Sequence, residues 1–116
     1  LAHGEFASGM TARTVADSIS VGAPANGYGA VRKLRAHHGR CVEVSDDEIL
    51  DAQLELSRRT GLFAEPAAAA SYAGLRAVRS EIEPQAVVVL LVTGTGLKDI
   101  DAAAERVTLP TGVSDG

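Results

Sequence analysis

The chain has 116 residues, of which 46% are hydrophobic and 22% are charged. This length fits one domain or one lobe of a larger domain, and the composition is that of a globular protein rather than a disordered one. A net charge of −4 argues against a general nucleic-acid surface, because neutralising phosphates requires clustered Lys and Arg. The longest wholly apolar run, residues 86–92, is far too short to span a bilayer, so we expect neither nucleic acid nor a membrane as a partner.

The single cysteine and the two ends of the chain give further expectations. Cys41 is the only cysteine, which excludes an internal disulfide and fits a reducing, cytoplasmic compartment. The sequence starts with Leu1 rather than Met, and residues 1–13 mix Gly, Ser and short apolar residues without a period. We therefore expect residues 1–13 to be a loop or the end left by a truncation. Residues 106–116 carry few apolar side chains and are expected to be a flexible tail.

The first predicted element is ambiguous, and a helix follows it. Residues 14–21 fit either a strand or one helical turn. The turn at 22–26 precedes a helix that we predict over 27–38. Asn26 can cap the start of this helix, and Gly39 can take the left-handed position that ends it. The expected inner face consists of Ala30, Val31 and Leu34.

A short strand and a capped helix come next. Residues 41–44 alternate and predict a short strand. Ser45 and Glu48 have the spacing of a capping box, in which each side chain binds the other residue's backbone N–H, and Gly61 closes the helix that begins there. The apolar face of this helix consists of Ile49, Ala52 and Leu56, with Leu50 and Leu54 beside them.

A third helix and a buried strand complete the pattern. Pro66 suits the first position of a helix, because its missing N–H is not needed there. The inner stripe of this helix is nearly all small residues and should let its backbone press close to a neighbour. Its members are Ala67, Ala70, Ser71, Gly74, Leu75 and Val78. Residues 86–92 form a continuous apolar run rich in β-branched residues, as in a parallel strand buried on both faces. The order helix, strand, helix, helix, strand predicts an α/β fold.

The predicted buried strand leads directly into residues 93–99 (TGTGLKD). In open α/β sheets, ligands bind beyond the carboxyl ends of the strands, and two glycines beside two threonine hydroxyls allow close approach together with hydrogen bonding. We therefore predict a ligand site here; the alternative is a plain turn in which glycine relieves strain. The segment is not a Walker loop, and Asp99 stands where a dinucleotide fingerprint needs a third glycine.

Four segments of the chain match one enzyme family. Residues 93–99 resemble the "TGxGLKD" segment near the C-terminus of threonine synthases. Residues 60–71 (TGLFAEPAAAAS) resemble that family's "EGIFAEPASAAS", and residues 42–50 resemble its "VTDEEIL". Residues 14–19, followed by Gly-Ala-Pro at 22–24, resemble its "TIATAIxxGxP". No single segment is specific, but four in the right order are.

The resemblance implies that residues 14–105 are the C-terminal part of the α/β domain of a fold-type II pyridoxal-phosphate enzyme, an open, mostly parallel sheet flanked by helices. The full-length protein would convert phosphohomoserine to threonine and phosphate by β,γ-elimination and replacement, with pyridoxal 5'-phosphate as cofactor, and would be a homodimer. The family's Schiff-base lysine and phosphate loop lie in segments that this sequence lacks. The chain alone is therefore expected to be an inactive fragment with no catalytic residue of its own.

The resemblance also implies site residues. In this family the first threonine of "TGxGLKD", which is Thr93 here, hydrogen-bonds the pyridine nitrogen of the cofactor, and Gly94 is expected beside it. A neutral hydroxyl does not hold a proton on that nitrogen, so it moderates the electron sink and favours elimination and replacement. Glu65 is either a cofactor-side carboxylate or an N-terminal helix acid. Asp17 departs from the threonine synthase pattern toward that of the ammonia-lyases and is expected on the substrate side of the ring.

Two other functions stay open at this point: a serine/threonine ammonia-lyase of the same fold, and a small non-catalytic α/β ligand-binding module. The only lysines, Lys33 and Lys98, are expected to be exposed cations rather than Schiff-base residues. His37, His38 and Cys41 lie close together in the sequence, but adjacent helical histidines point to different sides and no fourth ligand is evident. We therefore predict no metal site.

Overall fold

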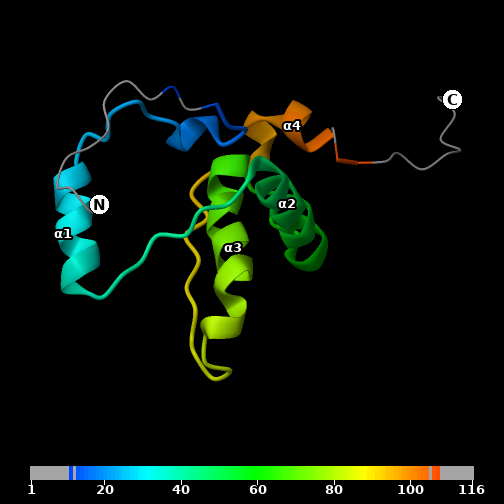
Figure 1. Cartoon of the computed structure of the whole chain (residues 1–116). Coiled ribbons are helices and arrows are strands. Elements are labelled where there is room, and N and C mark those ends of the chain that lie inside the picture. Colours follow the sequence, from blue (N-terminus) through cyan, green and yellow to red (C-terminus); the bar gives the residue numbers. More distant parts are fainter. Residues whose placement is uncertain (1–10, 12, 105, 108–116) are drawn as a thin grey trace, which may run out of the picture.

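The computed structural model describes residue 11, residues 13–104 and residues 106–107. Within these residues the chain forms the helices α1 (Gly27–Ala36), α2 (Asp46–Thr60), α3 (Pro66–Val78) and α4 (Ile100–Ala104). The described residues also form three 3-10 turns, one before α1 at Asp17–Ile19 and two between α3 and α4 at Arg79–Glu81 and Gly96–Lys98. Helices α2 and α3 pack against each other, α4 lies against α2, and α1 stands apart from this group (Figure 1).

Helix α2 begins and ends as its sequence predicts. The Glu48 backbone N–H donates to the Ser45 hydroxyl at 3.3 Å, and the Ser45 N–H donates to the Glu48 carboxylate at 2.7 Å, so the capping box is confirmed. Gly61 ends the helix at a φ of +76°, a left-handed conformation that glycine adopts without a steric penalty. Pro66 likewise stands at the start of α3, as predicted.

The core lies between α2 and α3 and is built largely from small side chains. The predicted apolar face of α2 is buried, with Ile49, Ala52 and Leu56 at its centre. Helix α3 contributes Ala69 and Ala73, which allow its backbone to approach α2 closely. The prediction for the inner face of α3 is wrong in register, because α2 packs on the neighbouring face. The predicted stripe is only half-buried throughout: Ala67, Ala70, Ser71, Gly74, Leu75 and Val78.

Helix α1 departs from its prediction at both ends. Asn26 is the N-cap residue, but its side chain makes no capping hydrogen bond. The helix ends at Ala36, two residues early, and His38 rather than Gly39 has the left-handed φ, +52°. Of the expected inner face, Ala30 is exposed, because no other helix packs closely on that side of α1.

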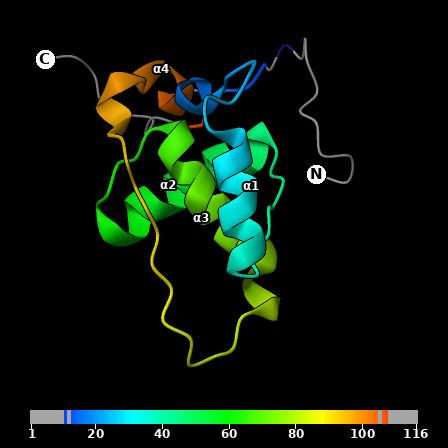
Figure 2. The ribbon, with the colours of Figure 1, turned by 90° about the vertical axis from the view of Figure 1, so that its left-hand side faces the viewer.

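The described residues contain no β-strand, so the predicted sheet is not observed. Residues 41–44 and 86–92 are irregular, and residues 14–21 take the helical alternative, a 3-10 turn over Asp17–Ile19. The prediction that 86–92 is buried on both faces is wrong for this structure. Val87 and Val89 are 92% and 80% exposed, because no described segment offers the row of backbone groups with which a strand must pair. In both views residues 86–92 form an extended segment that runs back from the end of α3 toward α4 without pairing with another strand (Figure 2).

The shape of the chain agrees with this open arrangement. Its radius of gyration is 16.9 Å, whereas a compact domain of 100 residues has about 13 Å. The predictions for 1–13 and 106–116 fall mostly outside the described residues, although Arg106 forms ion pairs with Asp47 and Asp51 of α2. No helix in the described ranges is long and apolar enough to cross a membrane.

Candidate functional site

The loop that carries the TGTGLKD sequence is fastened to the segment that precedes α3. The Glu65 backbone N–H donates to the Gly94 carbonyl at 3.1 Å, and the Gly96 N–H donates to the Phe63 carbonyl at 2.8 Å. These two hydrogen bonds flank an antiparallel bridge between Ala64 and Thr95. Two motifs that the sequence analysis treated separately are therefore parts of one site.

The two glycines of this loop are required by close contacts with the facing segment. A Cβ at position 94 would overlap the carboxylate of Glu65 and come within 2.9 Å of its Cγ. A Cβ at position 96 would lie 2.7 Å from the ring of Phe63. Real Cβ atoms do not approach other atoms so closely, so each glycine allows the loop to lie directly on the segment that leads into α3.

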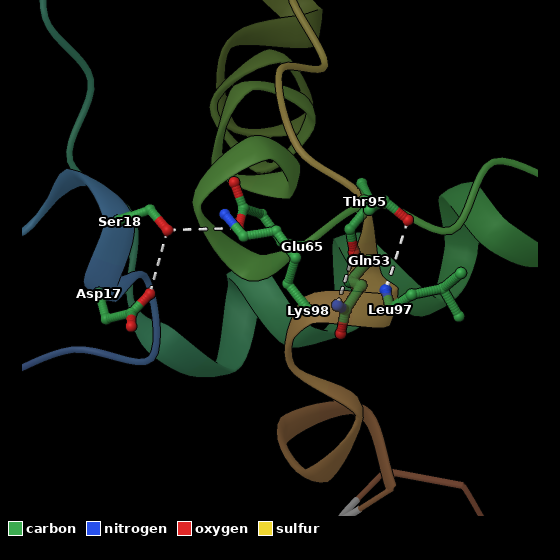
Figure 3. Close-up of polar contacts among 8 residues, drawn as sticks. Asp17, Ser18, Gln53, Glu65, Thr95, Leu97 and Lys98 are labelled. Atoms are coloured by element: carbon green, nitrogen blue, oxygen red, sulfur yellow. Dashed lines mark hydrogen bonds and ion pairs between the residues drawn. The ribbon is translucent and has the colours of Figure 1, made fainter.

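Glu65 is a buried carboxylate at the centre of three distant segments (Figure 3). Its side chain is 9% exposed and stands at the N-cap position of α3 without capping the helix. Its Oε2 atom accepts hydrogen bonds from Lys98 Nζ at 3.1 Å and from the Ser18 hydroxyl at 3.2 Å. A largely buried carboxylate needs hydrogen-bond donors in place of its lost hydration, and Lys98 and Ser18 provide them here.

The segment that brings Ser18 to Glu65 is anchored on α2. The Thr14 hydroxyl and the Val15 N–H both donate to the Asp46 carboxylate, at 2.5 and 3.2 Å. Ala16, which is 1% exposed, fixes the same segment in the core. The Asp46 carboxylate thus has two roles. It interacts favourably with the helix dipole in the first turn of α2, and it holds the residues before Ser18.

Gln53 of α2 supports the segment that carries Glu65, a role that was not predicted from the sequence. The residue is 2% exposed, and its Nε2 atom donates to the Ala64 carbonyl at 2.7 Å. A glutamine between the apolar positions of α2 was the available signal. A polar residue on a helix face that is otherwise buried must find a hydrogen-bond partner, and here that partner is the backbone beside Glu65.

Thr93 lies at the edge of a shallow hollow. Its side chain is exposed, and it has no hydrogen-bond partner among the described residues. The Thr95 hydroxyl is held in place, since its oxygen accepts from the Leu97 N–H at the start of a 3-10 turn. The hollow is lined by Gly61, Leu62, Phe63, Val92, Thr93, Gly94, Thr95 and Leu97.

The four predicted site residues are therefore only partly brought together. Thr93 and Gly94 line the hollow, whereas Glu65 lies behind Gly94 and is occupied by Lys98 and Ser18. Asp17 is exposed and lies on the other side of Glu65 from Thr95 (Figure 3). Its Oδ1 atom is 3.2 Å from the Ser18 hydroxyl, whose single proton is shared between Asp17 and Glu65, so the two carboxylates compete for one donor. In the part of the chain that the structure describes, the hydrogen bonds bring Asp17 no nearer to the loop than Ser18.

The remaining candidates lie away from this loop. His37, His38 and Cys41 are all exposed, and the part of the chain that the structure describes holds no group of three or more side chains able to bind a metal ion. Lys33 is exposed on α1, as predicted. Lys98 is 60% exposed but is held by Glu65, so it is not simply a solvated cation.

Comparison with known proteins decides the family. Residues 1–94 match the model of a family described as pyridoxal-phosphate dependent enzymes. The chain belongs to that family. Membership implies the fold-type II fold and pyridoxal phosphate as cofactor, although no strand forms in the residues described here. The sheet of that fold thus remains a prediction for residues 86–92.

Several curated proteins that are similar to this chain are threonine synthases. The chain is 42% identical to the threonine synthase of Halalkalibacterium halodurans over 96 residues, which cover 81% of this chain and 27% of the relative. It is 41% identical to that of Methanocaldococcus jannaschii and 44% identical to that of Bacillus sp. strain ULM1, each over 92 residues. Those two matches cover 78% of this chain and 23% and 26% of the relatives. The chain thus spans about a quarter of the length of these relatives.

The residues of the hollow suit one edge of the family's cofactor. Its lining combines apolar side chains with the unused hydroxyl of Thr93, which is the combination that a flat heteroaromatic ring requires. No lysine or arginine lines this hollow in the structure. The residues therefore fit a contact to the ring, and they do not supply a covalent or phosphate-binding partner.

Proposed function

We propose that this chain is the C-terminal portion of a pyridoxal-phosphate dependent threonine synthase, which converts phosphohomoserine and water to threonine and phosphate. The observation that carries the proposal concerns Thr93, which lines the hollow on a loop fastened to the Phe63–Glu65 segment. Its hydroxyl has no hydrogen-bond partner among the described residues. The identity of more than 40% to threonine synthases over 92 to 96 residues supports the same activity.

In the proposed site Thr93 holds the ring nitrogen of the cofactor. Pyridoxal phosphate, when bound there, would supply an electron sink for negative charge on the substrate carbons. Thr93 Oγ1 donates one hydrogen bond to the ring nitrogen and carries no charge. A neutral partner cannot keep that nitrogen protonated, as a carboxylate would, so the sink stays moderate and elimination with replacement is favoured.

The other residues of the loop shape the site rather than react. Gly94 lets the loop lie against Glu65, and Leu62, Phe63 and Leu97 present apolar surface that keeps water from one side of the ring. The role of Glu65 and Asp17 as cofactor-side residues remains a prediction, together with the inactivity of the chain alone and a homodimeric full-length protein. The lysine and the phosphate-binding groups would come from the remainder of the enzyme.

Substrate assays on the full-length protein test the proposal. With phosphohomoserine we expect release of phosphate and threonine in equal amounts. With threonine or serine alone we expect little ammonia and little 2-oxo acid. Ammonia and 2-oxo acid without phosphate turnover would instead indicate the ammonia-lyase alternative, toward which the aspartate at position 17 points. Failure to bind pyridoxal phosphate at all would leave a non-catalytic binding module.

A further inference from the structure

One residue, Glu65, fastens the Thr93 loop at two points. Its backbone N–H binds the Gly94 carbonyl at 3.1 Å, one residue after Thr93, and its carboxylate binds Lys98 Nζ at 3.1 Å. Glu65, at the N-terminus of α3, therefore binds both ends of the 94–98 segment. Among the described residues, the ion pair is the only side-chain hydrogen bond in that closure, because the other hydrogen bonds between the two segments join backbone groups.

The ion pair is asymmetric in its exposure, which limits what it can contribute. The Glu65 side chain is 9% exposed, so it depends on its partners, whereas the Lys98 side chain is 60% exposed. A pair that is open to water on one side adds little to global stability. Its effect should instead be local, restricting how far the loop can move from the segment that precedes α3.

We infer that Lys98 is a positioning residue for the reaction, and that its ion pair with Glu65 sets the place of the Thr93 hydroxyl. This inference rests on the proposed function, since it gives Lys98 a role through Thr93 and not through contact with the cofactor. It also separates Lys98 from Lys33, the only other lysine of the chain, which lies exposed on α1.

Three variants of the full-length protein isolate the ion pair. Lys98→Met removes the charge and keeps most of the apolar stem, Lys98→Arg keeps the charge, and Lys33→Met is the matched control.

In the cofactor-free protein we measure hydrogen exchange of the loop amides, and then the affinity for added pyridoxal phosphate from its absorbance. Lys98→Met should raise exchange at Gly96 and weaken cofactor binding about two- to fivefold, which is the range of an exposed pair. Lys98→Arg should restore most of both, and Lys33→Met should change neither.

A double-mutant cycle with Thr93→Val separates this inference from the proposed function. If Lys98 acts through Thr93, Lys98→Met should weaken cofactor binding less in the Thr93→Val background than in the wild type. Unchanged exchange and affinity in Lys98→Met, beside a weakened Thr93→Val, would overturn the positioning role and leave the proposed function standing. If Thr93→Val itself leaves the affinity unchanged, the ring contact fails and the positioning role fails with it.

Discussion

Glycine at position 94 allows a loop and a buried carboxylate to occupy adjacent space. Two backbone hydrogen bonds bring the loop to the Phe63–Glu65 segment, and only an α-hydrogen separates the backbone at 94 from the Glu65 carboxylate. Nearby, Gln53 and Ser18 satisfy the groups that this close approach buries. The site is therefore a small polar network on an alanine-rich core, in which each member depends on the others.

Gly94→Ala is predicted to destabilise the 116-residue chain by about 1–3 kcal/mol, the usual cost of overpacking, because Glu65 must move and weaken its bond to Lys98. Thermal unfolding followed by circular dichroism measures the change. The matched control is Gly74→Ala on α3, where an added Cβ meets nothing within 4 Å. Alanine in a helix interior should stabilise by about 0.5–1 kcal/mol. Equal melting temperatures for the two variants would contradict the close contact at position 94.

Among the elements, helix α2 has the strongest local signals, and its capping box gives a pH-dependent prediction. The Ser45 backbone N–H, and after it the Ser45 hydroxyl, lowers the pKa of Glu48. The folded-state pKa is thus below the unfolded one. The stability that Glu48 contributes is fully present above the unfolded pKa and is lost as the pH falls through the folded pKa.

Glu48→Gln should flatten this part of the pH dependence, because glutamine at the same position can still accept from the Ser45 N–H but does not titrate. Melting temperatures of the chain measured between pH 6 and pH 3 should therefore fall less steeply for Glu48→Gln than for the wild type. Ser45→Ala should lower stability by about 1 kcal/mol at neutral pH and keep part of the pH dependence, since its backbone N–H remains. Parallel pH profiles of Glu48→Gln and the wild type would show that the box does not act in this way.

Elements with local causes could be predicted from the sequence, and elements with distant causes could not. The capping box, Gly61 and Pro66 act within one turn, so α2 and the start of α3 form as expected. The register of α3 depends on which neighbour covers it, and the 3.6-residue pattern of small residues fits two adjacent faces. The end of α1 was misjudged because His38, not the glycine after it, takes the left-handed conformation.

The site could be predicted only in part for the same reason. The segments that meet at Glu65 were each identified in the sequence, but their contact depends on the fold. The Lys98–Glu65 pair joins residues 33 positions apart, and Ser18 is 47 positions from Glu65. Neither spacing belongs to a recognisable sequence pattern, so the sequence predicts an exposed cation at Lys98 and not its ion pair. The hydrogen bond from Gln53 to the Ala64 carbonyl likewise depends on the fold.

Over the whole molecule, the main departure from the predicted fold is the apolar run at 86–92. A strand buried on both faces requires neighbours on each edge and layers above and below, and the described residues provide none of them. The run is left exposed, with Val87, Val89 and Leu91 at 92%, 80% and 74%. Since the chain spans about a quarter of its relatives' length, we propose that the pairing strands belong to the remainder of the enzyme.

Val89→Lys should therefore have opposite effects in two settings. An unpaired apolar segment favours association between chains, so the lysine should raise the monomer fraction of the 116-residue chain in size-exclusion chromatography. In the full-length protein the same lysine should destabilise the fold, because it places a charge in the sheet. Val21→Lys, at a valine that is 63% exposed outside the run, is the control for the first setting. An equal gain in monomer from both lysines would mean that the run is not the cause of association.

The proposed contact between Thr93 and the ring nitrogen underlies both the proposed function and the inference about Lys98. It can be measured as the ¹⁵N chemical shift of pyridoxal phosphate labelled at its ring nitrogen and bound to the full-length protein. We predict that Thr93→Val moves this shift and that Thr93→Ser, which keeps the hydroxyl, leaves it near the wild-type position. The same shift in the wild type and in Thr93→Val would contradict the contact, and the assignment of this hollow as the ring-binding site would be wrong.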